Sequence, residues 1–213
     1  MAVKPFDLSL YLVLDPDLCG SLGMVETARA AVAGGATMVQ LRDKHADTER
    51  MIATGRALKA ALAGTEVPLI VNDDVEAAIA IGADGVHVGQ NDLDAAAVRA
   101  RVGPAMILGL SIGTVALAQT VDPDIIDYVG VGPVFPTATK PGHPPAIGYG
   151  GLAAVTAASP VPVVAIGGLK ARHVGETLAT GAAGLAVVSA ICGTPDPKAA
   201  AAALLYAIRR AQA

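Results

Sequence analysis

Cationic and amide side chains gather at the end of one apolar run, in the stretch "VQLRDK" that spans residues 39–44. The run ends abruptly in Gln40, Arg42, Asp43 and Lys44, although only 16% of the chain is charged. Two cations this close together, in a chain this poor in charge, indicate an anionic partner. The alternative is a pair of solvated loop cations, because exposed charge needs no special explanation.

Carboxylate and amide side chains follow two later apolar runs. Asn72 and Asp73 come after one run, and Gln90 and Asp92 come after the next. Hard oxygen ligands suit Mg²⁺, which usually keeps water and substrate phosphate in its shell. We therefore predict that Asp73 and Asp92 share a magnesium ion. The alternative is that these residues only cap the helical segments that follow them.

A diphosphate beside that metal would need positive charge, which Arg42, Lys44 and Lys140 could supply. Lys140 lies far along the chain, in a segment over residues 133–148 that contains several prolines and glycines. The segment is longer than the usual connection between elements, which is typical of a lid. We therefore expect Lys140 to reach the diphosphate when the lid closes.

A repeated local pattern predicts the elements that position these residues. Gly-Ala stands after a helical segment and before a short apolar run at Gly35, Gly82 and Gly181, starts that are 47 and 99 residues apart. Glycine can end a helix in the left-handed conformation, and a short apolar run is typical of a strand buried on both faces. The near one-to-two spacing indicates a repeating helix-plus-strand unit.

Eight apolar runs are predicted to be strands, at residues 8–14, 37–41, 68–71, 85–88, 106–110, 128–131, 163–166 and 184–188. Predicted helices between them include residues 24–33, 48–62, 75–81 and 93–101. This alternation favours a parallel sheet covered by helices. The predicted fold is a single-domain α/β protein, a (β/α)₈ TIM barrel over residues 1–213. A doubly wound sheet would usually carry a glycine fingerprint after its first strand, where this chain has "DPDLCG".

Chemistry in such barrels belongs to the loops after the carboxyl ends of the strands. The polar residues collect there: Gln40, Arg42, Lys44, Asn72, Asp73, Gln90, Asp92, Ser111, Thr137, Thr139, Lys140 and Ser189. Their coincidence on one rim weakens the separate explanations as loop, turn or cap residues. His87 alternates with valines inside a strand and is predicted to pack in the barrel interior instead of binding a ligand.

A second anion site is predicted after the last two strands, at "IGG" (residues 166–168) and "VVSA" (residues 187–190). Barrels often bind a monophosphate there through backbone N–H groups, and glycine lets that backbone approach closely. Thr137 and Thr139, which could also be turn residues, lie on the same rim. The sequence therefore suggests one metal-assisted anion site and one without metal.

Composition excludes several function classes. A net charge of −4 does not give the basic field that nucleic acid or an anionic membrane surface would require. The two cysteines have no metal-ligand spacing and do not indicate a disulfide framework, so a reduced cytoplasmic setting is expected. No apolar run approaches the roughly 18 residues of a membrane span, and the first run is too short for a signal peptide. The sequence leaves open whether the protein forms a homo-oligomer.

Six motifs in order along the chain resemble the thiamine phosphate synthase family, also called thiamine-phosphate pyrophosphorylase. They are "VQLRDK", "VNDDVEAAIAIGADGVHVGQND", "GLSIGT", "GVGPVFPTATKPGHPPAIG", "VVAIGGL" and "AVVSAI". The resemblance covers nearly the whole chain, and "TATK" and "HVGQND" are its most specific parts. It implies a transferase that couples 4-amino-5-hydroxymethyl-2-methylpyrimidine diphosphate to 4-methyl-5-(2-phosphoethyl)thiazole. The products would be thiamine monophosphate and pyrophosphate, which agrees with two anion sites.

The resemblance also implies roles for individual residues. The pyrimidine diphosphate would be held by Gln40, Arg42, Lys44, Asn72, Ser111 and Lys140, of which Arg42, Lys44, Lys140 and Ser111 would act in catalysis. Asp73 and Asp92 would bind Mg²⁺. The thiazole phosphate would be held by Thr137, Thr139, Gly168, Val188 and Ser189.

Two positions depart from the family pattern, because Leu14 stands where many members have threonine and Asp74 where many have arginine. The sequence leaves two alternative functions. A thiazole tautomerase-like isomerase would generally lack the full metal and diphosphate set, which is present here. A non-catalytic binder of thiamine precursors could lose the metal, so the retained Asp73 and Asp92 argue against it.

Overall fold

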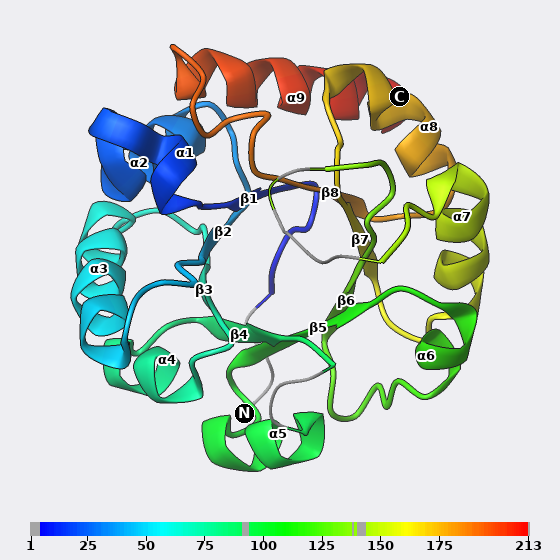
Figure 1. The fold of residues 1–213 in the computed structure, drawn as a ribbon, viewed down its shortest axis with the longest axis horizontal. Helices are drawn as coiled ribbons and strands as arrows, with labels where there is room; N and C mark the ends of the chain where they lie inside the picture. The colour runs from blue at the N-terminus through cyan, green and yellow to red at the C-terminus, as the bar shows by residue number, and fades with distance from the viewer. Residues whose placement is uncertain (1–4, 91–93, 138, 140–143, 213) are drawn as a thin grey trace.

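Eight parallel strands close into a barrel in a computed structural model of the chain, which describes residues 5–90, 94–137, 139 and 144–212 (Figure 1). The strands are β1 (Leu10–Val13), β2 (Met38–Leu41), β3 (Leu69–Asn72), β4 (Gly85–Val88), β5 (Ile107–Ile112), β6 (Tyr128–Val131), β7 (Val163–Ile166) and β8 (Gly184–Val187). Each strand pairs with the next, and β8 closes the ring against β1. The predicted TIM barrel is thereby confirmed.

The helices form a ring outside the strands (Figure 1). They are α1 (Pro16–Cys19), α2 (Gly23–Ala33), α3 (Thr48–Ala61), α4 (Val75–Ile81), α5 (Ala95–Val102), α6 (Val115–Gln119), α7 (Gly148–Ala158), α8 (Val174–Ala179) and α9 (Pro197–Gln212), with short 3₁₀ turns at Gly20–Leu22 and Ala171–His173. Asp74 caps α4 by accepting a hydrogen bond from the backbone N–H of Ala77 at 2.8 Å, and Asp94 caps α5. The residues that cap these two helices are therefore Asp74 and Asp94.

Alternation along the strands sorts their side chains into two cores. Leu10, Leu12 and Val39 belong to a large cluster between the strands and the helices, whereas Tyr11 and Met38 belong to a smaller cluster inside the barrel. A strand buried on both faces explains why each run is almost continuously apolar. The inner positions at the carboxyl ends of the strands are the ones free to carry polar groups toward a ligand.

Side-chain hydrogen bonds also join neighbouring strands at the end of the barrel where the strands begin. The residue before β4, Asp84, accepts a hydrogen bond from the backbone N–H of Leu69 at 3.0 Å and donates its own backbone N–H to the carbonyl oxygen of Leu69 at 2.9 Å. Asp127 makes the same two contacts with Leu108, before β6. Thr37, before β2, makes them with Leu10.

We call these three contacts, made by Thr37, Asp84 and Asp127, the clasps. Thr37 and Asp84 are the third residues of two of the Gly-Ala repeats found in the sequence. Two copies of the repeat therefore end in a residue whose side chain binds the start of the preceding strand. The third copy has Ala183 there, which keeps only the backbone bond, to the carbonyl oxygen of Val163 at 2.8 Å.

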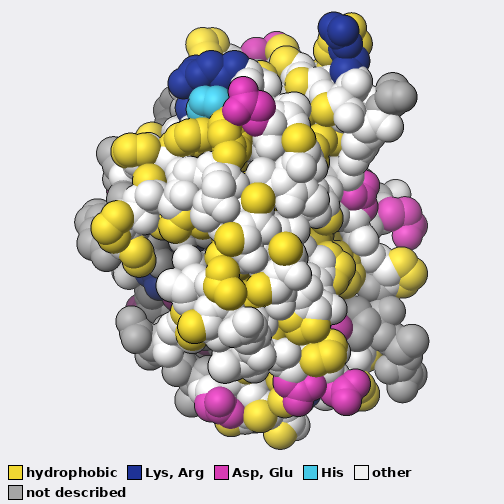
Figure 2. Space-filling model, turned by 90° about the vertical axis from the view of Figure 1, so that its right-hand side faces the viewer, with side chains coloured by type: hydrophobic (Ala, Val, Ile, Leu, Met, Phe, Trp, Pro, Cys, Tyr) yellow, Lys and Arg dark blue, Asp and Glu magenta, His cyan; other side chains and the backbone are white. Residues whose placement is uncertain are grey.

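The N-terminal residues 5–9 run across the centre of the ring (Figure 1). The ring of Phe6 lies 5.9 Å from that of Tyr128, so this segment packs against the inner core. Figure 2 shows the side of the barrel at the right of Figure 1, where hydrophobic side chains are dispersed and charged ones lie toward the edges. Among the described residues, no helix is both long and apolar enough to span a membrane.

Candidate active site

One cavity of about 170 Å³ opens at the carboxyl ends of the strands. Nine of the predicted site residues line it: Gln40, Arg42, Asn72, Ser111, Thr137, Thr139, Gly168, Val188 and Ser189. They come from the ends of six strands and the loops that follow. A wider hollow next to it is lined by Lys44 as well as by Arg42, Thr139 and Ser189. Residues that are up to 149 positions apart in the chain, such as Gln40 and Ser189, therefore meet at one mouth.

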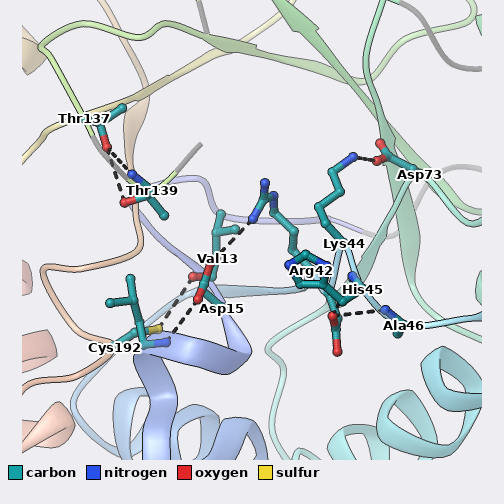
Figure 3. A network of polar contacts seen from close by, with 12 residues as sticks. Val13, Asp15, Arg42, Lys44, His45, Ala46, Asp73, Thr137, Thr139 and Cys192 are labelled. Carbon is teal, nitrogen blue, oxygen red and sulfur yellow. Dashed lines mark hydrogen bonds and ion pairs between the residues drawn. The ribbon is translucent and has the colours of Figure 1, made fainter. Parts of the chain in front are cut away.

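Arg42 is held in place by Asp15, a residue that sequence reasoning did not include. The guanidinium Nη1 lies 3.6 Å from Oδ2 of Asp15, and both side chains are largely buried (Figure 3). The other oxygen of Asp15 accepts a hydrogen bond from the backbone N–H of Leu18 at 3.1 Å, capping α1. One carboxylate thus caps α1 and pairs electrostatically with the guanidinium, which favours this orientation of Arg42 before any anion arrives.

Lys44 and Asp73 form an ion pair across the loops after β2 and β3 (Figure 3). The backbone of Asp73 has φ of 62°, in the left-handed region that non-glycine residues seldom occupy. Asp and Asn tolerate this conformation best, and such positions concentrate at functional sites. The arrangement brings a predicted metal ligand and a predicted diphosphate ligand together.

The donor chemistry at this place fits a magnesium ion. Asp73 offers a partly exposed carboxylate, and the side chain of Asn72 lines the adjoining cavity, so hard oxygen ligands are present. The second predicted ligand, Asp92, lies outside the described residues, as does Lys140. In the part of the chain that is described, no three His, Cys, Asp or Glu side chains form a metal-binding group.

The opposite wall of the cavity is built from glycine and hydroxyl groups. Gly168 has φ of 69°, and a Cβ there would lie 2.8 Å from the carbonyl oxygen of Pro136, so this backbone requires glycine. The hydroxyl of Thr137 accepts a hydrogen bond from the backbone N–H of Thr139 at 3.2 Å (Figure 3). These groups match what a phosphate needs, namely close backbone approach and hydroxyl donors.

Lys170 adds a cation to this wall, and sequence reasoning missed it. Its ammonium Nζ donates to Oγ of Ser189 at 3.0 Å. Burial, together with the charge of Arg172, lowers the pKa of Lys170 below that of an ordinary lysine. Only its position two residues after "IGG" could have drawn attention to it in the sequence.

A chain of buried polar groups forms the floor of the cavity. The hydroxyls of Tyr11 and Tyr128 lie 2.9 Å apart, and Gln40 Nε2 donates to the Tyr11 hydroxyl at 2.7 Å. His87 lies between Tyr128 and Ser111, with Nδ1 2.9 Å from the tyrosine oxygen and Nε2 2.8 Å from Ser111 Oγ. His87 is indeed buried in the barrel interior, but it also lines the cavity through this chain.

Comparisons with known proteins agree with this geometry. A family model described as thiamine monophosphate synthase matches residues 10–191. A thiamine-phosphate synthase of Xanthobacter autotrophicus is 50% identical over 209 residues, covering 98% of this chain and 99% of that protein. One from a Psychrobacter species is 49% identical, covering 93% of this chain and 94% of that protein. A solved structure of thiamine phosphate pyrophosphorylase from Pyrococcus furiosus superposes with a TM-score of 0.86 at 33% identity, covering 97% of this chain and 98% of that one.

Proposed function

The chain belongs to the thiamine monophosphate synthase family, and from that premise we propose how its own residues carry out the reaction. It is a transferase that joins the pyrimidine diphosphate to the thiazole phosphate, giving thiamine monophosphate and pyrophosphate. One observation supports the assignment of residues: the cavity and the hollow beside it carry Arg42, Lys44 and amide groups on one wall, and glycine, hydroxyl groups and Lys170 on the other.

The diphosphate is assigned to the wall formed by the loops after β2 and β3. Arg42, held by Asp15, presents a fixed guanidinium, which suits bidentate contact with phosphate oxygens. Lys44 adds a second cation beside it, and Lys140 would add a third from the lid. Gln40, Asn72 and Ser111 complete the pyrimidine side of the same cavity.

Magnesium is assigned to Asp73 and Asp92, with the diphosphate as the third partner. When bound, the ion would neutralise negative charge on the departing pyrophosphate. The protein's part is to hold the Asp73 carboxylate at the rim beside Lys44. Because Lys44 already pairs with Asp73, metal and ammonium would meet the same diphosphate from adjacent positions.

The thiazole phosphate is assigned to the other wall, where Thr137, Thr139, Gly168, Val188 and Ser189 line the cavity. Two different anions bound on facing walls would direct the thiazole nitrogen toward the pyrimidine methylene carbon. The bond from that carbon to the diphosphate oxygen breaks and both electrons leave with pyrophosphate; the nitrogen lone pair then forms the new carbon–nitrogen bond. Alignment and charge stabilisation suffice, so a strong general base is unnecessary.

We also propose that residues 1–213 act as one domain in the cytoplasm, that they need no nucleic acid or membrane partner, and that any assembly is a homo-oligomer. A reduced compartment agrees with Cys19 and Cys192, which are both free and buried.

The test is pyrophosphate release with both substrates and Mg²⁺, measured for matched variants. Arg42→Ala should raise the KM for the pyrimidine diphosphate and lower kcat, because Arg42 is oriented before binding. Ser189→Ala should raise the KM for the thiazole phosphate alone. Lys198→Ala, an exposed lysine on α9, is the control and should change neither. Equal weakening toward both substrates in either site variant would show that the walls are misassigned.

The two residues outside the described part of the chain make separate tests of the same proposal. Asp92→Ala should abolish most turnover while the thermal unfolding midpoint stays unchanged. Lys140→Ala should lower kcat by about a hundred- to thousandfold, as is typical for a contact made mainly in the transition state. The dissociation constant of the Lys140→Ala protein for the pyrimidine diphosphate should change little. A Lys140→Ala protein that binds poorly yet turns over normally at saturation would remove Lys140 from the lid role.

A further inference from the structure

The buried polar chain under the cavity has a direction that the hydrogen-bonding capacities of its members determine. Gln40, Tyr11, Tyr128 and His87 are each at most 7% exposed, so solvent water can satisfy few of their hydrogen bonds and contacts with protein groups must satisfy the rest. Each tyrosine has a single O–H hydrogen to donate, and a neutral histidine has one donating and one accepting nitrogen. A chain of such groups can therefore run in only one direction at a time.

The donor at one end fixes that direction. Gln40 donates to the Tyr11 oxygen, so Tyr11 uses its own hydrogen toward Tyr128. Tyr128, which already accepts that bond, donates to Nδ1 of His87. His87 then carries its hydrogen on Nε2 and donates to Ser111 Oγ. In the reverse direction, the hydrogen of the Tyr11 hydroxyl would face the amide nitrogen of Gln40. That nitrogen donates hydrogen bonds and cannot accept one, so the hydrogen would be left without an acceptor.

Both tyrosines remain neutral links, because burial raises the pKa of each well above its ordinary value. Glycines on the neighbouring strands leave space for the side chains of Tyr128 and His87. A Cβ at position 109 would lie 2.2 Å from Cζ of Tyr128 and 2.5 Å from Nδ1 of His87, so only glycine there leaves room for the contact. A Cβ at position 130 would lie 3.2 Å from Cε1 of His87.

We propose that Tyr128 is a positioning residue, which holds His87 in the tautomer protonated on Nε2 and thereby makes Ser111 a hydrogen-bond donor toward the cavity. Ser111 accepts from His87, so its own hydrogen is left for a ligand. The consequence for recognition is that this end of the cavity selects a ring atom that accepts a hydrogen bond, such as an unprotonated ring nitrogen. This inference rests on the proposed function only in identifying the ligand as the pyrimidine substrate.

The tautomer can be observed in the free protein, without substrate. In ¹⁵N-histidine-labelled protein, long-range ¹H–¹⁵N correlations distinguish the two nitrogens, and comparison with His87→Gln assigns the signals of His87 among the four histidines. The expected result is a proton on Nε2. A proton on Nδ1 would mean that the chain runs the other way, with the Gln40 amide turned over, and would overturn the proposal.

Two variants that each remove one hydroxyl test the direction of the hydrogen bonds in the chain. Tyr128→Phe should release His87, so that a signal of the Nδ1-protonated tautomer appears. Tyr11→Phe should leave the Nε2 tautomer in place, because Tyr128 still has His87 as its acceptor. The matched control is Tyr206→Phe, which removes an exposed hydroxyl on α9 and should leave the His87 signals unchanged. Equal shifts of the tautomer in all three variants, or in none, would contradict the chain.

Kinetics then separate positioning from a merely structural role. Tyr128→Phe should raise the KM for the pyrimidine diphosphate by about threefold to tenfold, the size of one neutral hydrogen bond, and leave the KM for the thiazole phosphate unchanged. Loss of the Nε2 tautomer without a change in KM would remove Tyr128 from substrate positioning. Wild-type protein that releases no pyrophosphate would refute the proposed function, and the NMR result would still decide the tautomer.

Discussion

Lys170 and Ser189 show how one residue from each of two neighbouring strand ends can build a charged contact. The Lys170 ammonium already donates to the Ser189 hydroxyl, on the wall assigned to the thiazole phosphate. Because both desolvation and Arg172 disfavour its charged form, a bound phosphate would relieve an unfavourable state. The contact is specific to the thiazole side, since Arg42 and Lys44, the described cations assigned to the diphosphate, lie on the loop after β2.

We therefore expect Lys170→Gln to raise the KM for the thiazole phosphate about tenfold and to leave the KM for the pyrimidine diphosphate unchanged, with Lys198→Gln as control. The lowered pKa adds a pH dependence. Lys170 loses its charge at a lower pH than an ordinary lysine, so thiazole-phosphate binding should weaken earlier as the pH rises. That alkaline weakening should disappear in Lys170→Gln. If it persists there, another group is responsible.

Single residues also show where sequence reasoning stops. Gln40, Arg42 and Ser189 were found because polar side chains at the ends of apolar runs are conspicuous. Asp15 and Lys170 were missed because each is an ordinary loop charge until its partner is known. Arg42 and Asp15 are 27 positions apart and meet only through the pairing of β1 with β2.

At the scale of elements, the contacts that stabilise the barrel lie apart from those that bind substrate. The clasps lie at the starts of the strands, whereas the cavity lies at their ends. Asp84→Ala would remove the acceptor of the Leu69 backbone N–H but keep the backbone bond beside it, as Ala183 does naturally. The expected loss is about 1–3 kcal/mol in the free energy of unfolding, the usual cost of leaving a buried donor, here the Leu69 N–H, without its acceptor.

That loss should be measured by urea unfolding, with Asp124→Ala as the exposed control. The KM values for both substrates should stay unchanged at temperatures where the variant is folded. A change in kcat or KM with unchanged stability would mean that Asp84 serves the site and not the scaffold.

The places of the eight strands followed from the sequence, but their limits did not. β5 runs to Ile112, two residues beyond the prediction, so Ser111 lies inside a strand and not in the loop after it. β1 begins at Leu10, later than the predicted residue 8, because Asp7 turns the chain by accepting the backbone N–H of Ser9 at 2.8 Å. Hydrophobic patterns do not register such local hydrogen bonds, which decide where an element ends.

At the scale of the whole molecule, closure of the barrel joins Tyr11 of β1 to Tyr128 of β6 across 117 positions. Alternation along each strand could place both tyrosine side chains inside the barrel, and the repeating helix-plus-strand unit predicted that the barrel closes. Their contact depends on the register of all the strands between them, which no local pattern contains.

The buried tyrosines predict how stability varies at alkaline pH. Below about pH 10 both are neutral in the folded and unfolded protein and contribute no pH dependence. Above it, tyrosine ionises in the unfolded chain but stays neutral in the barrel, because burial raises both pKa values. The free energy of unfolding should therefore fall as pH rises, by up to about 1.4 kcal/mol per pH unit for each tyrosine.

Urea unfolding of wild type and Tyr128→Phe between about pH 8 and pH 11 tests this, because groups common to both proteins cancel in the difference. The variant should show a shallower decline above about pH 10, while Tyr206→Phe should follow the wild type. Parallel curves for all three proteins would show that Tyr128 ionises in the folded state as easily as in the unfolded one.

The clasps also determine where this chain can be cut into two cooperating fragments. Each clasp joins an odd-numbered strand to the even-numbered strand after it, so a break between such pairs leaves every clasp within one fragment. A cut after the exposed Gly64 keeps Leu69 and Asp84 together, whereas a cut after the exposed Gly82 places them in different fragments. Coexpressed fragments 1–64 and 65–213 should therefore reassemble into active enzyme more readily than fragments 1–82 and 83–213, which makes pairs of strands the units in which this barrel can be divided.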